Sequence, residues 1–141
     1  AEPADDGVRR YGHGCWNLAA TWRNSPNVST DHFEIGLRGA PPLAPAFLLV
    51  GASDSFWGEH PLPLDLGAMG RMPRGCVLFA DPALLIPITT DEDGRAAAHI
   101  RVSSEPWLVG VTHYAQWAVR MPWPHAWGWA LSDALQVTVR P

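Results

Sequence analysis

The chain of 141 residues contains no lysine, so its ten basic residues are all arginine. Runs of basic residues are also missing, and the formal net charge is −4. A chain of this kind lacks the electrostatic footprint of a nucleic-acid-binding protein. No apolar stretch reaches the roughly 18 residues that a membrane-spanning helix needs. We therefore expect neither a nucleic-acid partner nor a membrane-spanning segment.

Motifs of catalysis and cofactor binding are missing as well. No serine lies in a Gly-x-Ser-x-Gly context, and no Gly-rich phosphate loop is present. The histidines show no close metal-ligand spacing such as His-x-His. The sequence therefore predicts a non-catalytic protein without a cofactor. Two weaker alternatives stay open, because folding brings distant residues together: a hydrolase built from converging acids, and a metal site assembled from His13, His60 or His125.

Cysteine is scarce, with only Cys15 and Cys76, each of which follows a glycine. An even pair outside a metal-binding pattern, in a chain that starts without methionine, predicts one disulfide. We expect an oxidising location: secreted, and extracellular, periplasmic or on the cell surface. The bridge would close a loop of roughly 60 residues and contribute about 4 kcal/mol in the chain-entropy model. The alternative is two unrelated buried thiols.

Proline and glycine, by contrast, are abundant, at 14 and 13 residues. They oppose long helices and favour short strands joined by turns. Apolar and polar residues alternate with period two in 16–23 and 31–38, and 107–120 is the longest strand candidate. The acidic run 91–94 is typical of a hairpin turn. About eight short strands predict an all-β antiparallel β-sandwich of Greek-key or immunoglobulin-like type in residues 11–141. Residues 1–10 are expected to be a loose tail or connector.

Eight tryptophans are the strongest functional signal. One loop, 121–129, holds three of them and a histidine: Trp123, His125, Trp127 and Trp129. Two prolines stiffen this loop, and extended backbone around Gly128 would project Trp127 and Trp129 to one side. Rigid aromatic rings on a stiff loop suit docking on a protein or stacking on sugars. A local mini-core in which the rings pack on each other is the plainer alternative.

A second aromatic segment, 53–60, contains Trp57 among polar residues. Trp57 either joins the contact surface or covers the edge of the sandwich. Taken together, these features predict a secreted structural or interaction module that docks on other protein chains, or on a second copy of itself, in an extracellular or cell-surface assembly. The alternative is a carbohydrate-binding module that stacks sugars on Trp123, Trp127 and Trp129.

Several motifs carry a family resemblance: Tyr11-Gly-His-Gly-Cys15, Pro61-Leu-Pro-Leu-Asp-Leu66, Gly75-Cys76 and Tyr114-Ala-Gln-Trp117. The chain resembles a family of small secreted β-rich domains from planctomycete- and myxobacteria-like bacteria, over about residues 11 to 139. The resemblance implies secretion and a Cys15–Cys76 bridge, and it implies no catalytic residues, because no activity is established for that family. Small or aliphatic residues usually stand in such domains where this chain has the three tryptophans of the 121–129 loop.

Overall fold

The computed structural model describes residues 7–29, 32–68, 75–121 and 128–141. Within these ranges the chain forms twelve strands and one short 3-10 helix, η2 (Pro106–Leu108). The strands are β1 (Val8–Tyr11), β2 (Ala19–Arg23), β3 (Phe33–Arg38), β4 (Pro45–Gly51), β5 (Phe56–Trp57), β6 (His60–Pro61), β7 (Leu64–Asp65), β8 (Val77–Leu78), β9 (Leu84–Thr89), β10 (Ala96–Ile100), β11 (Thr112–Arg120) and β12 (Trp129–Thr138). No described helix is long and apolar enough to cross a membrane.

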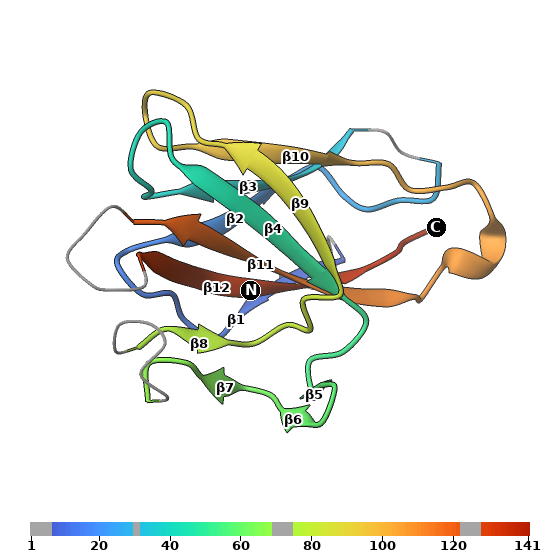
Figure 1. Ribbon diagram of the computed structural model, residues 1–141. Helices are drawn as coiled ribbons and strands as arrows, with labels where there is room; N and C mark the ends of the chain where they lie inside the picture. The colour runs from blue at the N-terminus through green and yellow to red at the C-terminus, as the bar shows by residue number, and fades with distance from the viewer. Residues whose placement is uncertain (1–6, 30–31, 69–74, 122–127) are drawn as a thin grey trace.

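Eight of these strands form two antiparallel sheets (Figure 1). The larger sheet has the order β1-β12-β11-β4-β9, and the smaller sheet has the order β10-β3-β2. The chain crosses between the sheets after β1, β3, β9 and β10. As a result, β4 and β9 pair in one sheet while β3 and β10 pair in the other, which is a Greek-key arrangement. The predicted class, an all-β antiparallel sandwich, is confirmed.

The four additional strands, β5 to β8, are only two residues long and lie between β4 and β9. They belong to a segment that we call the strap, residues 52–68 and 75–81. The sequence predicted about eight strands, and the difference comes from the strap. Strands of two residues are too short to show the alternation that identified the others.

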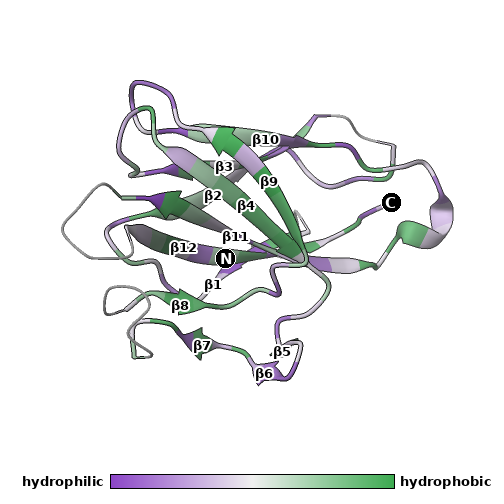
Figure 2. Cartoon of the chain, viewed as in Figure 1, coloured by the Kyte–Doolittle hydropathy of each residue, from purple (hydrophilic) through white to green (hydrophobic). Residues whose placement is uncertain are grey.

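Trp117 on β11 is fully buried in the middle of the sandwich. Its indole Nε1 donates a hydrogen bond to the carbonyl oxygen of Gly36 on β3, at 2.9 Å. This bond joins the two sheets, and Phe33, Leu37 and Leu48 are buried in the same core. Figure 2 shows apolar residues along the strands and hydrophilic residues along the turn between β9 and β10. Burial of apolar area between the sheets is therefore the main stabilising contribution.

A β-bulge lies beside this tryptophan. The pairing shifts between Gln116 and Ala118, so two residues of β12, Ser132 and Asp133, stand opposite Trp117. Such a bulge re-aims the side chains near it. The carboxylate of Asp133 accepts a hydrogen bond from the backbone N–H of Ala20 at 2.7 Å. That bond satisfies a backbone donor of β2, an edge strand whose unpaired groups would otherwise invite pairing with another chain.

Arg10 on β1 also contacts the edge strand β2. Its Nε lies 3.0 Å from the carboxylate of Asp133, and its Nη2 donates to the carbonyl oxygen of Ala20 at 2.7 Å. The guanidinium also lies over the ring of Trp22, 5.5 Å from its centroid. The Arg10–Asp133 pair thus occupies the N–H and the carbonyl of Ala20 as a neighbouring strand would.

The N-terminal prediction needs a correction. Residues 8–10 were expected in a loose tail, but they form β1 and pair with β12, and Val8 is fully buried. The alternation of apolar residues is short here, because Arg9 and Arg10 interrupt it. Only the tertiary pairing reveals this strand. Residues 1–6 of the predicted tail lie outside the described part.

Three local predictions also differ from the structure. The expected strand 107–120 starts only at Thr112, because η2 occupies its beginning. The alternation in 16–23 includes Trp16 and Asn17, which instead form a turn with φ of 60° and 64°. The turn 91–94 does not close a hairpin, since β9 and β10 belong to different sheets. In each case the residue pattern is compatible with a strand or hairpin. The chain crosses from one sheet to the other at this point, however, and forms a turn or a short helix instead.

Candidate functional site

The tryptophan-rich loop is only partly described. Trp123, His125 and Trp127 lie outside the described residues, so their predicted contact role stays a prediction. Trp129 is described as the first residue of β12 and is half-buried. Its ring lies 5.7 Å from that of Phe47, with 31° between the planes, and the Arg120 guanidinium lies 6.0 Å from its centroid. Trp129 thus packs against the sandwich.

Trp57 lies on the β5–β6 hairpin, where the structure exposes two neighbouring aromatic side chains. Phe56 is 57% exposed and Trp57 is 40% exposed. The connecting turn has Gly58 at φ 59°, followed by Glu59 at negative φ, as in a type II′ turn. Across the hairpin, the ring of Trp57 lies 5.6 Å from that of His60, at an angle of 40°. Of the two alternatives for Trp57, the structure therefore favours a surface position over coverage of the sandwich edge.

The strap that carries this hairpin packs on the face of the larger sheet that points away from the smaller sheet (Figure 1). Gln116 holds it there and is fully buried. Its Oε1 accepts from the backbone N–H of Phe79 at 2.8 Å, and its Nε2 donates to the carbonyl oxygens of Val77 at 2.8 Å and Ser132 at 2.7 Å. Gln116 and Trp117 are neighbours that face opposite sides of the sheet, so both faces of β11 are covered.

The predicted disulfide supplies a second attachment. Cys15 and Cys76 are bonded, with Cα atoms 5.1 Å apart and a sequence separation of 61. The backbone N–H of Cys15 donates to the carbonyl oxygen of Leu131 on β12, at 2.9 Å. The bridge thus ties the strap to the segment after β1, which is hydrogen-bonded to β12 of the larger sheet. It is compatible with an oxidising, extracellular environment.

Tyr11 is a third contact between the sandwich and the strap. Its hydroxyl donates to the carbonyl oxygen of Phe79 at 3.3 Å, and the two rings meet edge to face at 5.9 Å. Burial of the phenol, with the charge of Asp54 nearby, raises the pKa of Tyr11 well above its ordinary value. The neutral phenol is therefore the form that this contact requires.

The histidines do not gather into a metal site in the described part of the chain, where no group of three or more His, Cys, Asp or Glu side chains is placed to hold an ion. His13 packs its ring against Phe79 at 5.4 Å, and His60 faces Trp57. His99 pairs with Glu34 at 3.6 Å. His125, the remaining candidate of the metal hypothesis, lies outside the described residues.

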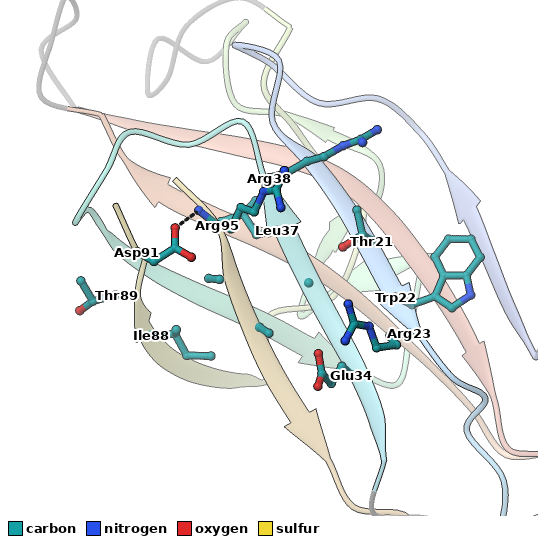
Figure 3. A pocket seen from close by; sticks show the side chains of 13 residues that line it. Thr21, Trp22, Arg23, Glu34, Leu37, Arg38, Ile88, Thr89, Asp91 and Arg95 are labelled. Atoms are coloured by element: carbon teal, nitrogen blue, oxygen red, sulfur yellow. Dashed lines mark hydrogen bonds between the residues drawn. The ribbon is translucent and has the colours of Figure 1, made fainter. Parts of the chain in front are cut away.

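A hollow of about 660 Å³, which the sequence did not predict, lies on the outward face of the smaller sheet (Figure 3). Residues of β2 and β3 border it, and the residues at the start of β10 close one side. Ile88 and Thr89, at the end of β9 in the larger sheet, line it as well. In Figure 3, Arg95 extends towards β3 at one end of the hollow, while Arg23 and Glu34 lie together at the other end. The ring of Trp22 points away from it. In the sequence, the outward-facing residues of β2 and β3 are the polar positions of two alternating patterns. The sequence does not show that these two strands are neighbours.

Comparison of the chain with protein-family models, with curated proteins and with solved structures finds no match. The family resemblance of the sequence motifs therefore stays an expectation.

Proposed function

We propose that this chain is a non-catalytic, secreted binding module that docks on other protein chains of an extracellular or cell-surface assembly. The observation that supports it best is the exposure of Phe56 and Trp57 at the tip of the β5–β6 hairpin. Full burial of an aromatic side chain of this size contributes about 1.5–3 kcal/mol. Phe56 and Trp57 are partly exposed, so a partner surface that covers the hairpin would gain the corresponding part of this free energy. Aromatic side chains are also enriched in the energetic centres of protein interfaces.

The arrangement of the two rings favours a protein over a sugar as the partner. Phe56 and Trp57 are consecutive residues of a strand, so their side chains leave opposite faces of the hairpin. The neighbouring ring of His60 is tilted by 40° from that of Trp57. These rings do not form the flat platform on which successive sugar units stack. Rings with mixed orientations instead suit an irregular, apolar protein surface.

The attachment of the strap supports the same proposal. Binding segments are commonly loops positioned by a rigid scaffold. Here the backbone N–H of Asp81 donates to the carbonyl oxygen of Ser53 at 3.0 Å, which closes the base of the strap. Together with the Cys15–Cys76 bridge, this bond limits the conformational freedom that a partner would have to remove on binding.

The test places a photo-reactive benzophenone amino acid at position 57 and, as a matched control, at position 107. Trp107 is 73% exposed and lies on η2, outside the strap. Each labelled protein is mixed with the proteins of its native surroundings and irradiated. We expect a discrete protein adduct from position 57 and none from position 107. A second copy of the chain counts as a partner, and its adduct would be recognised by doubled mass.

Light scattering of the unmodified protein and of the F56S/W57S double variant completes the test. Self-association that disappears in the double variant, but persists in Trp107→Ser, supports docking through the hairpin. The proposal is wrong if position 57 forms no specific protein adduct and the mass is that of a monomer throughout. Binding on a glycan array that Trp57→Ser abolishes would favour the carbohydrate-binding alternative.

A further inference from the structure

The hollow on the outward face of the smaller sheet has the size of a small-molecule site, at about 660 Å³. One row of its lining consists of small residues, because Gly36 of β3 pairs with Ala97 of β10 on one side and with Thr21 of β2 on the other. A Cβ atom at position 36 would collide with the Thr21 hydroxyl. The glycine thus leaves room for Thr21 to lean across this row with its hydroxyl oxygen.

The rim of the hollow is cationic. Three of its lining residues, Arg23, Arg38 and Arg95, are arginines. Within the described structure, none of their guanidinium groups forms an ion pair or a hydrogen bond. The charge of Arg95 acts on the carboxylate of Asp91 on the same rim, and the rim as a whole carries three arginines against two carboxylates in a chain with a net charge of −4. Guanidinium groups bind carboxylates with paired, charge-assisted hydrogen bonds, so the rim suits an anionic ligand.

Two carboxylates on the same rim restrict which anion fits. Glu34 lies on β3 beside Arg23, and Asp91 precedes β10. The backbone N–H groups of Arg95 and Asp93 donate to the carboxylate of Asp91 at 2.9 and 2.8 Å and hold its pKa below the ordinary value. Ionised carboxylates repel every anion, and they repel a phosphate or sulfate ester of high charge density more strongly than a singly charged carboxylate. They accept hydrogen bonds from hydroxyl groups, which a ligand with both carboxylates and hydroxyls would supply.

We propose that this hollow binds an acidic oligosaccharide, whose successive uronate carboxylates pair with Arg95 at one end and Arg23 at the other while ring hydroxyls donate to Glu34. The site lies on the smaller sheet, whereas the docking hairpin belongs to the strap, which packs on the larger sheet. Acidic-sugar binding is therefore a separate activity of the same module, and each can fail without the other.

Isothermal titration calorimetry with oligogalacturonate tests the proposal, with the fully methyl-esterified oligomer as a matched ligand that keeps the hydroxyls and loses the charges. We expect saturable binding of the acid and at least about tenfold weaker binding of the ester. Arg23→Gln and Arg95→Gln should each weaken binding of the acid about tenfold. Arg101→Gln removes the same charge from an exposed position outside the hollow and should leave the dissociation constant nearly unchanged.

Chemical-shift mapping by NMR decides whether binding occurs in the hollow. The amide signals of Thr21, Gly36 and Ala97 should move with the oligouronate and stay in place with its ester. The proposal is overturned if the acid does not bind saturably, or if Arg101→Gln weakens binding as much as the other two variants. Equal affinity for oligoglutamate, which has carboxylates but no ring hydroxyls, would overturn the assignment to sugars.

Discussion

The sandwich and the strap are two neighbouring regions that are held in place in different ways. In the sandwich, Ala115 to Val119 of β11 are buried without interruption, because the smaller sheet covers one face and the strap covers the other. The strap has strands of two residues, and its hairpin tip exposes two aromatic rings. A few attachments fix it: the disulfide, the amide of Gln116 and the phenol of Tyr11. Continuous apolar burial thus stabilises the sandwich. Separate attachments hold the strap, which carries the exposed hairpin, in place on it.

The largest expected effect comes from opening the sandwich itself. Trp117→Ala leaves a cavity between the sheets and removes the donor to the Gly36 carbonyl, so the free energy of unfolding should fall by about 5 kcal/mol. Trp107→Ala, at an exposed position, should change it by less than about 0.5 kcal/mol. Denaturant unfolding followed by far-UV circular dichroism measures both. Similar losses in the two variants would contradict the central role of Trp117.

The second-largest effect is expected from removing the disulfide, which should affect the strap more than the sandwich. The C15S/C76S double variant loses the constraint on a 61-residue separation, so it should be destabilised by about 4 kcal/mol in the chain-entropy model. The same protein with both cysteines present, but reduced, should behave alike. Hydrogen exchange should show that amides of the strap lose more protection than amides of β3 and β4. Uniform loss in both regions would mean that the strap and the sandwich unfold as one unit.

A smaller effect is expected at the amide that joins the strap to β11. Gln116→Leu leaves the N–H of Phe79 and the carbonyl oxygen of Val77 without their partner, so we expect a loss of about 2–3 kcal/mol. Gln136→Leu, on the neighbouring strand β12 and only half-buried, is the control and should cost little. Chemical denaturation of the two variants gives the comparison. If Gln116→Leu is as stable as the parent protein, apolar packing alone holds the strap.

The smallest expected effect is a response to alkaline pH. Burial raises the pKa of Tyr11, so the folded protein holds this proton more tightly than the unfolded chain does. The stabilisation is complete below the ordinary tyrosine pKa of about 10 and is lost as pH rises above it. Unfolding midpoints between pH 8 and 11 should therefore fall less in Tyr11→Phe than in the parent. Parallel curves would show that Tyr11 carries no part of the alkaline sensitivity.

The fold class was accessible from the sequence, because alternation and turn residues are local signals. The alternation of Phe33, Ile35 and Leu37 with polar residues correctly indicated β3, and the cysteine pair correctly indicated the bridge. Less of the candidate sites was accessible. Trp57 was identified as a candidate, but the neighbouring exposure of Phe56 was not, since a sequence does not show which apolar residues stay uncovered.

Sequence alone determined that this protein is a disulfide-bonded sandwich of short strands, because period-two patterning depends on the local backbone and on the burial of one face. Tertiary structure decided which strands became neighbours. It placed Thr21, Gly36 and Ala97 side by side in the hollow, and it turned Asp133 towards the edge of β2 through a bulge. These placements follow from the pairing of distant strands, whose free energy is summed over many non-local contacts and leaves no trace in any short stretch of sequence.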